Sequence, residues 1–273
     1  MLLTIDIGNT NITLGLYVDQ QLGPRWRIRT IHDKMPDEYG ILLHQLFRHR
    51  GYRPDQVTGV AIASVVPPLT LTFEQVCRDY LGQRPLVVDA GVRTGVRIRY
   101  AHPREVGADR VVDAAAVRVL YGVPACVVDF GTATTFDAIS AEGDYLGGAI
   151  APGIGIAAQA LFERTAKLPR VELVRPPSVI GRNTVHSMQS GLLFGYVALV
   201  EGMVTRFRAE LGADMSVVAT GGLAELVARE TQAIDVVDPW LTLHGLRIIY
   251  ELNREPEQEV HRQGASSQSA RSK

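Results

Sequence analysis

Short apolar runs alternate with segments of helical periodicity along most of the chain. The short runs, five to seven residues rich in Val, Ile and Leu, have the length of buried strands. The longer segments place apolar residues three and four positions apart, which is typical of amphipathic helices. The pattern predicts an α/β protein with strands over 2–7, 59–65, 85–89, 125–130, 147–151 and 215–220 and helices over 38–49, 108–120 and 191–211.

The last of these helices, 191–211, is apolar on more than one side. Leu193, Val200 and Val204 follow one helical period, and Leu199 widens the stripe beyond a single face. A helix with two apolar sides has two neighbours. We expect the second neighbour to be a partner subunit.

The most informative pattern is an internal repeat. Residues 6–17 and 129–140 each read apolar strand, Asp-x-Gly, a turn rich in Thr or Asn, and a second apolar strand. A third segment carrying Leu-Gly follows each copy, at 22–23 and 146–147. An approximate repeat with this spacing predicts two similar halves, not a solenoid.

Two positions divide the chain into predicted units. The halves are expected to meet near 100–109, which gives an N-terminal half over 1–105 and a C-terminal half over 106–253. The remaining residues, 254–273, contain one valine as their only large apolar residue. Such a segment cannot bury enough surface to offset the entropy of ordering it, so we expect a disordered tail.

The composition, 46% hydrophobic and 21% charged, is that of a soluble globular protein. A formal net charge of −1 gives no electrostatic basis for binding nucleic acid or an anionic membrane surface. Cys77 and Cys126 lie in apolar runs and are expected to be reduced core residues. We find no signal peptide and no apolar run near the length of about 20 residues that spans a bilayer. We therefore expect a cytoplasmic protein.

Each repeat places a carboxylate, Asp6 or Asp129, at the end of a predicted strand. The glycine that follows lets backbone N–H groups approach a ligand, and the hydroxyls of Thr10 and Thr132 add neutral donors. This arrangement suits phosphate, with a cation such as Mg²⁺ between the carboxylate and the phosphate oxygens. The alternative is an ordinary hairpin whose aspartate accepts hydrogen bonds from the turn. The second copy favours the phosphate site.

A third turn, Thr220–Gly222, follows the strand predicted over 215–220. Its glycine pair would let a flat ring such as adenine lie against the backbone. In chain order, Asp-x-Gly-x-Thr, Asp-x-Gly-Thr and Thr-Gly-Gly resemble the two phosphate elements and the adenosine element of the sugar kinase, Hsp70 and actin superfamily. This resemblance implies two ribonuclease H-like halves, each a mixed sheet flanked by helices.

Two other nucleotide-binding motifs do not account for the sequence. The chain has no G-x-x-x-x-G-K-[ST], so a P-loop is excluded. Residues 153–158 fit G-x-G-x-x-A, and Glu172 lies about where a ribose-binding acid belongs. However, Pro152 directly precedes the motif, which lies in the middle of the chain instead of in a first βαβ unit. We expect a structural loop that leads into a helix.

Asp109 and Arg110 lie at the start of the helix predicted over 108–120. Asp109 could be a helix cap worth about 1 kcal/mol. Arg110 in the first turn is disfavoured by the helix dipole, so stability alone does not account for it. An acid beside a guanidinium could instead accept a hydroxyl proton while the arginine binds an anionic substrate. The spacing leaves both interpretations open.

These motifs together resemble one family, the type III pantothenate kinases, which includes the Bvg accessory factor-like proteins. The resemblance covers about residues 1–252 in the expected order. It implies ATP-dependent phosphorylation of the 4′-hydroxyl of pantothenate, the first step of coenzyme A synthesis. The residues that carry it are DIGNTNITLG (6–15), Y-x-x-P-R-E-V-G-A-D-R (100–110), DFGTATTFD (129–137), GDYLGGAIAPG (143–153), LFERTAKLP (161–169), IGRNTVHSMQSG (180–191) and ATGG (219–222).

The resemblance also implies roles for individual residues. Asp109 corresponds to the proton acceptor, Asp129 to the ligand of a monovalent cation, K⁺ or NH₄⁺, and Asp6 to the Mg²⁺ side of the ATP site. The implied ATP-binding residues are Asp6, Ile7, Gly8, Asn9, Thr10, Asn11, Ile12, Thr13, Thr132, Gly221 and Gly222. The implied pantothenate-binding residues are Tyr100, Gly107, Ala108, Asp109, Arg110 and Thr184, the last near a dimer interface.

The family is dimeric, which agrees with the two-sided helix, so a homodimer that binds ATP and pantothenate is expected. Neither phosphate loop contains Lys or Arg, so backbone dipoles and bound cations are expected to neutralise the phosphates. Thr13 stands where some relatives carry Lys, and His102 where many carry Asn. His186 is expected to be structural.

Two other functions fit the same fold: a non-catalytic ATP-binding regulatory or accessory protein, and a kinase for a different small hydroxyl substrate. A protein that only binds ATP would not need the acid at Asp109. Its presence together with Asp6, Arg110 and Asp129 therefore favours the enzyme.

Overall fold

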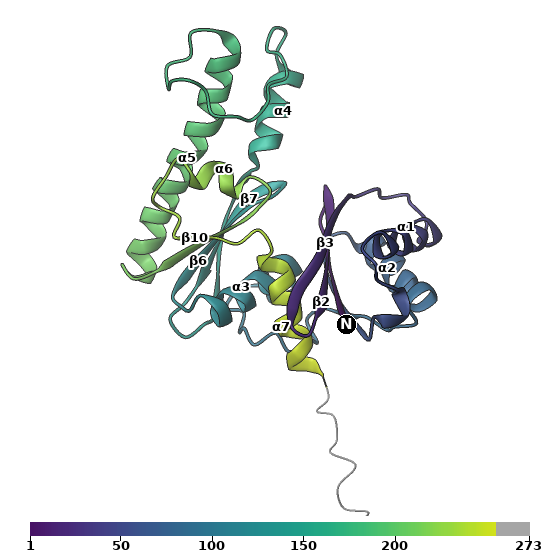
Figure 1. Ribbon diagram of the computed structural model, residues 1–273. Helices are drawn as coiled ribbons and strands as arrows, with labels where there is room; N and C mark the ends of the chain where they lie inside the picture. The colour runs from purple at the N-terminus through teal and green to yellow at the C-terminus, as the bar shows by residue number, and fades with distance from the viewer. Residues whose placement is uncertain (255–273) are drawn as a thin grey trace, which may run out of the picture.

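The computed structural model describes residues 1–254, so the predicted tail, apart from Arg254, lies outside the described residues. The strands of one sheet are β1 (Leu2–Ile7), β2 (Asn11–Val18), β3 (Gln21–Arg29), β4 (Gly59–Ser64) and β5 (Leu86–Val87). Those of a second sheet are β6 (Ala125–Phe130), β7 (Ala133–Ile139), β8 (Tyr145–Pro152), β9 (Ser216–Gly221) and β10 (Val236–Val237). The strand orders are β3-β2-β1-β4-β5 and β10-β9-β6-β7-β8 (Figure 1).

The two sheets share one topology. In each sheet the first three strands in chain order form antiparallel pairs. The first strand also pairs in parallel with the fourth, and the fourth with the fifth. The Leu-Gly segments at 22–23 and 146–147 lie in the third strand of each sheet, as the repeat predicts. The predicted fold class, two similar α/β halves with mixed sheets, is confirmed.

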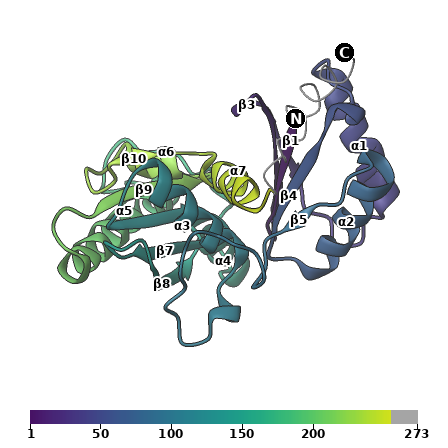
Figure 2. The same cartoon turned by 90° about the horizontal axis from the view of Figure 1, so that it is seen from below.

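The helices are α1 (Pro36–His49), α2 (Pro67–Leu81), α3 (Ala108–Leu120), α4 (Ile154–Arg164), α5 (Thr184–Leu211), α6 (Ala224–Ala228) and α7 (Leu241–Asn253), with 3₁₀ turns at Pro54–Gln56 and Pro103–Glu105. α1 and α2 cover the outer face of the first sheet, and α3 and α7 lie between the two sheets (Figures 1 and 2). α5 packs on the second sheet, and its first turns extend with α4 as an arm at the top of Figure 1.

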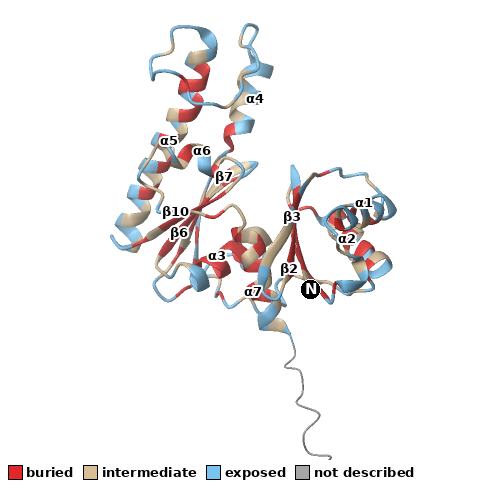
Figure 3. Ribbon diagram, in the orientation of Figure 1, coloured by how far each residue is buried: buried red, intermediate tan, exposed pale blue. Residues whose placement is uncertain are grey.

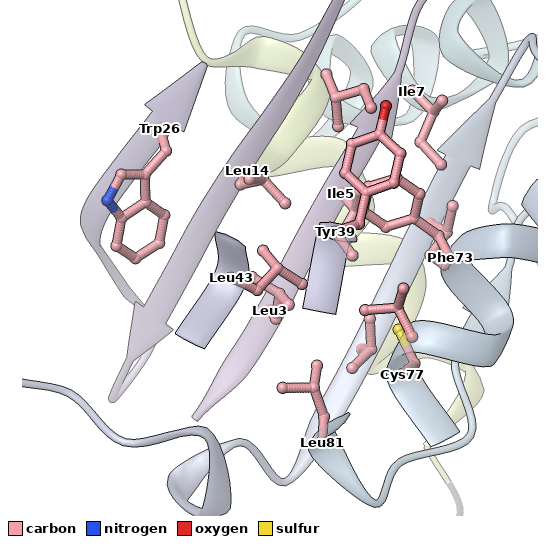
Figure 4. Packing of buried hydrophobic residues seen from close by; sticks show 14 of the residues in the cluster. Leu3, Ile5, Ile7, Leu14, Trp26, Tyr39, Leu43, Phe73, Cys77 and Leu81 are labelled. Atoms are coloured by element: carbon pink, nitrogen blue, oxygen red, sulfur yellow. The ribbon is translucent and has the colours of Figure 1, made fainter. Parts of the chain in front are cut away.

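Alternation along the strands decides which layer each side chain faces. Leu3, Ile5 and Ile7 of β1 are fully buried and pack with Phe73 of α2 in the outer core of the first half (Figure 4). Burial is highest in the strands and in the helix faces against them (Figure 3). Asp6 alternates with these residues, so its side chain faces the second sheet. A polar residue on this inner face lies in the space between the halves.

The predicted strands and the helices near 38–49 and 108–120 lie within two residues of their expected bounds. The helix predicted over 191–211 begins earlier, at Thr184, because the Asn183 side chain caps it by accepting a hydrogen bond of 2.8 Å from the His186 N–H. α2 and α7 were not among the predicted helices. α2 begins at Pro67, a residue that marks a helix start as readily as a turn.

The last helix, α7, returns to the first sheet and contacts β1, β4 and α3. Its contact with α3 is close at Gly245, where a β-carbon would lie 2.1 Å from the carbonyl oxygen of Val112. α7 therefore connects the two halves, and the boundary predicted between residues 105 and 106 stays a prediction. Cys77 and Cys126 are buried free thiols, as expected. No helix in the described part of the chain has the length and apolar character needed to cross a membrane.

Candidate active site

The first predicted phosphate loop is a tight hairpin turn between β1 and β2. The Gly8 N–H donates a 3.0 Å hydrogen bond to the Asn11 carbonyl, which leaves Asn9 and Thr10 as the turn residues. Thr30, which directly follows β3, fixes this turn from the side. Its hydroxyl donates to the Gly8 carbonyl at 2.6 Å, and its N–H donates to the Thr10 carbonyl at 3.0 Å.

The second phosphate loop meets the first across the space between the sheets. The Thr10 and Thr132 Oγ1 atoms lie 2.8 Å apart, within hydrogen-bond distance. These residues are 122 positions apart in the chain and belong to the two copies of the repeat. The contact brings the two strand-end turns face to face.

Three carboxylates gather behind these turns. Asp6 and Asp129 occupy the same place in their sheets, the fifth residue of a six-residue central strand. Asp109 lies in the first turn of α3. The pKa of Asp6 is raised to about 8, first by burial and then by the charges of Asp109 and Asp129, against the lowering effect of Arg27. The pKa of Asp129 is raised to about 7, mainly by burial and to a smaller extent by the charges of Asp109 and Asp137.

Neither Asp6 nor Asp129 has a hydrogen-bond donor or an ion-pair partner within residues 1–254. Unpaired carboxylates in a partly buried place favour a bound cation, and their hard oxygen atoms suit Mg²⁺ and K⁺. Among the described residues no three His, Cys, Asp or Glu side chains are grouped to hold a metal ion by themselves. The residues therefore suit cations that take their remaining ligands from phosphate and water.

The predicted adenosine turn lies beside Asp129. Gly221 has a φ of +92°, and a β-carbon there would lie 2.4 Å from Asp129 Oδ1 and 2.6 Å from the Phe130 carbonyl. Only glycine fits this conformation and this close approach. We expected the glycine pair to make room for a flat ring, and the structure adds that Gly221 makes room for the carboxylate.

The start of α3 is also built around a glycine. Gly107 is the N-cap residue, so Asp109 does not occupy the cap position and the interpretation of Asp109 as the helix cap is wrong. Its Oδ1 instead accepts a 2.8 Å hydrogen bond from the Arg110 N–H. A β-carbon at Gly107 would lie 2.4 Å from the same oxygen and 3.5 Å from Val65, which directly follows β4. Burial raises the pKa of Asp109, against the lowering effect of that hydrogen bond.

Arg110 has a structural partner that the sequence did not indicate. Its Nε donates to Asp137 Oδ1 at 2.6 Å, and both side chains are nearly buried. The Tyr145 hydroxyl donates to the same oxygen at 2.8 Å. The buried Nη2 of Arg110, in contrast to Nε, has no hydrogen-bond partner among residues 1–254. Asp137 thus holds the guanidinium at Nε, and Nη2 remains as a donor for an anion.

The structure separates the predicted pantothenate residues into two groups. The Tyr100 ring lies next to β8, 3.2 Å from where a β-carbon of Gly147 would be, and Arg110 approaches the adjacent Gly148. Gly107, Ala108 and Asp109 start α3. Thr184, however, is the first residue of α5 and lies in the arm, away from the start of α3 in the same chain.

The sequence reasoning missed two charged residues near the carboxylates. Asp113 lies one helical turn after Asp109 and is 4% exposed, and no described residue donates a hydrogen bond to its Oδ1. Burial and the charge of Asp129 raise the pKa of Asp113 well above its usual range. Its four-residue spacing from Asp109 could have revealed it. Arg27 of β3 has no comparable local signal. Its positive charge lowers the pKa of Asp6 and of Asp129, against the larger effect of burial.

The G-x-G-x-x-A match at 153–158 has the structural role that we expected. Gly153 is the N-cap of α4, and its N–H donates to the Thr132 carbonyl at 3.1 Å. The preceding strand, β8, is antiparallel to β7, so no βαβ unit surrounds the motif.

Comparison with known proteins decides the family. A family model for type III pantothenate kinases matches residues 2–206. The chain belongs to the type III pantothenate kinase family. Curated type III pantothenate kinases from Moorella thermoacetica and Roseiflexus sp. are each 58% identical to it, over 93% of this chain and 100% of theirs. One from Brevibacillus brevis is 55% identical over the same shares. As a member of a pantothenate kinase family, the chain is a phosphotransferase that uses ATP.

Solved structures resemble the fold at low sequence identity. A Baf family protein from Campylobacter jejuni has a TM-score of 0.55 and 19% identity, covering 92% of this chain and 98% of that one. The ethanolamine utilization protein EutJ from Carboxydothermus hydrogenoformans has a TM-score of 0.52 and 13% identity, covering 90% and 89%. These likenesses support the two-sheet architecture and nothing more specific.

Proposed function

We infer that the enzyme transfers the γ-phosphoryl group of ATP to the 4′-hydroxyl of pantothenate, the first step of coenzyme A synthesis. The observation that carries this is the 2.8 Å contact between Thr10 and Thr132, which sets two phosphate-type turns against each other beside three carboxylates. The strong match to type III pantothenate kinases supports the choice of substrate. It does not favour the alternative of a non-catalytic accessory protein.

Asp109 is proposed as the proton acceptor. Its carboxylate takes the proton of the 4′-hydroxyl while the hydroxyl oxygen bonds to the γ-phosphorus. The bond from that phosphorus to the β–γ bridging oxygen breaks, and ADP leaves. Burial raises the pKa of Asp109 toward the range in which a carboxylate is an effective base near neutral pH. The backbone N–H of Arg110 keeps the Asp109 side chain oriented.

Arg110 is proposed to bind the carboxylate of pantothenate. Its buried, unpartnered Nη2 is a donor that an anionic substrate would satisfy. The ion pair with Asp137 holds the guanidinium in place before substrate arrives. Gly107, Ala108 and Tyr100 would form the wall around the same substrate.

The residues from Asp6 to Thr13, together with Thr132, Gly221 and Gly222, are proposed to bind ATP. Asp6 would hold Mg²⁺, directly or through water, and Asp129 a monovalent cation, K⁺ or NH₄⁺. When bound, these cations neutralise phosphate charge. Replacing K⁺ by Na⁺ should weaken ATP binding measured by calorimetry, and an unchanged affinity would count against the monovalent site at Asp129.

A homodimer is proposed from the arm. The arm and the segment that joins α4 to α5 expose several large apolar side chains, namely Ile156, Phe162, Val174, Val179, Ile180 and Val185. On α5, β-carbons at Gly191 and Gly195 would meet nothing within 4 Å, which leaves room for another helix. A partner's arm would also be able to supply the Thr184 that one chain keeps away from its own site.

Substitution of Gly195 by Trp tests this interface, because the single chain has room for the larger side chain. Light scattering should show a dimer for the native chain and for the control Ala209→Trp. Ala209 is an exposed residue near the C-terminal end of α5. Gly195→Trp should be monomeric and impaired with pantothenate. A native monomer with full activity would refute the dimer.

The buried free thiols support a reducing compartment, and we propose the cytoplasm.

A coupled assay of ADP release tests the kinase function itself. The native enzyme should release ADP only when pantothenate, Mg²⁺ and K⁺ are present. Asp109→Asn should lower kcat by at least about 100-fold, the scale of lost general-base catalysis, with nucleotide binding retained. Asp144→Asn, a partly buried carboxylate paired with Arg99, is the matched control and should keep native activity. No pantothenate-dependent ADP release, with or without K⁺, would overturn the proposal and favour the accessory protein. Release with another hydroxyl compound in a substrate panel would reveal a different substrate.

A further inference from the structure

Arg27 lies in β3, on the face of the first sheet that looks toward the second. Thr13 of β2 is paired directly with Asp6 of β1 on one side and with Arg27 on the other. Residues paired in this way project from the same face of a sheet. The neighbours of Arg27 in β3, Trp26 and Ile28, pack in the outer core, which fixes the guanidinium on the inner face.

The Arg27 side chain reaches across to the second half. Its Nη1 lies 3.5 Å from where a β-carbon of Gly222 would be, in the predicted adenosine turn. Its Cζ lies 6.0 Å from the centre of the Trp240 ring, at the start of α7. Arg27 therefore spans the interval between the Asp6 loop of one sheet and the glycine turn of the other.

The guanidinium has the Trp240 ring nearby but no charged or hydrogen-bonding partner among the described residues. Within residues 1–254 Arg27 forms no salt bridge, and no protein group accepts a hydrogen bond from it. Arg110, on the substrate side, is by contrast held by Asp137. Arg27 is also exposed, so its N–H donors are open to a ligand.

Charge balance indicates what that ligand is. Asp6, Asp109 and Asp129 are negative when ionised, and a nucleotide polyphosphate adds further negative charge. Arg27 lowers the pKa of both Asp6 and Asp129, against the larger effect of burial, so its positive charge acts on both. A guanidinium offers five N–H donors in a planar fork that matches phosphate oxygens.

We propose that Arg27 is a nucleotide-binding residue whose guanidinium crosses from β3 and binds the polyphosphate chain of the nucleotide between the Asp6 loop and the Gly221–Gly222 turn. This inference rests on the proposed ATP site. It assigns the cationic contact to the first sheet, outside both phosphate loops. ATP and ADP then connect the two halves through Arg27, whereas adenosine does not engage it.

Calorimetric titration of adenosine, ADP and ATP, with Mg²⁺ present, tests the proposal. Arg27→Ala should weaken ADP and ATP binding roughly 10- to 100-fold, the usual size of a hydrogen-bonded charge contact, and leave adenosine binding unchanged. Arg27→Lys should recover part of the loss, because it restores the charge but not the planar fork. The lysine variant keeps the test usable if the alanine variant does not fold.

Arg25→Ala is the matched control. Arg25 lies two residues earlier on the same face of β3, and its Cζ is 5.0 Å from the same Trp240 ring. Unlike Arg27, Arg25 is not among the charges that lower the pKa of Asp6 or Asp129. Native-like ADP affinity in Arg25→Ala would support the proposal.

Three results would overturn the assignment. One is native ADP affinity in Arg27→Ala, another is an equal loss for adenosine, and the third is an equal loss in Arg25→Ala. These results are distinct from failure of the proposed function, in which the native chain itself would not bind ADP or ATP.

Discussion

Replacing Asp6 by Asn should stabilise the ligand-free enzyme near neutral pH, although it removes a residue proposed to bind ATP. The Asp6 carboxyl is enclosed near two other carboxylates and has no donor of its own among the described residues. Burial raises its pKa to about 8, so the folded protein retains a proton that the unfolded chain releases near 3.8. The stability tied to this proton is fully present below the unfolded value and is lost as the pH rises through about 8.

The size of the effect follows from proton linkage. A group that keeps one extra proton in the folded state lowers the free energy of unfolding by about 1.4 kcal/mol for each pH unit. Between pH 5 and pH 7 Asp6 therefore accounts for a loss of about 3 kcal/mol. For a chain of this size such a loss lowers the Tm by roughly 6–12 °C.

Thermal melting without nucleotide or divalent cations, from pH 5 to pH 7 at constant ionic strength, measures this loss. The native Tm should fall with rising pH. Asp6→Asn should make this fall less steep, because the contribution of one titrating proton is removed. Asp144→Asn is the control, because Arg99 lowers the pKa of Asp144 and this carboxyl is already ionised throughout the range. Its slope should match the native slope.

A native Tm that stays level or rises between pH 5 and pH 7, with the same profile for Asp6→Asn, would refute the reasoning. Addition of Mg²⁺ and ATP gives a second reading of the same charge. The ligands should raise the Tm of the native enzyme at pH 7 more than that of Asp6→Asn, because a bound cation can displace the Asp6 proton and pair with the carboxylate, whereas the amide of Asn carries no charge.

The remaining predictions concern packing and substrate binding. Gly245→Ala should lower the free energy of unfolding by about 3 kcal/mol, because its β-carbon would collide with the Val112 carbonyl and push α3 away from α7. Gly155→Ala, in α4 with open space around it, should leave stability unchanged or slightly higher in the same denaturant titration. Equal stabilities of the two variants would contradict the close helix contact. Asp137→Asn should raise the KM for pantothenate roughly tenfold in steady-state kinetics by releasing Arg110, with nucleotide affinity unchanged. An unchanged KM would show that Arg110 does not depend on this ion pair for its position.

Local patterns determined the halves and much of the site. The repeat at Asp6 and Asp129 predicted matching strand-turn-strand units, because alternation and turn residues act over a few neighbouring positions. The two loops occupy equivalent places in sheets of one topology, as this repeat requires. The spacing of Asp109 within its helix was equally visible in the sequence.

What the sequence by itself determined is therefore the set of elements and the turn chemistry at their ends. Tertiary structure alone decided which of these ends meet. The contact of Thr10 with Thr132 and the ion pair of Arg110 with Asp137 join residues 122 and 27 positions apart. Arg27 reaches the carboxylates only because strand pairing places β3 beside β2, and Thr184 is kept away because α5 begins in the arm. Contacts of this kind depend on the packing of whole sheets and helices, and no local pattern of residues encodes them.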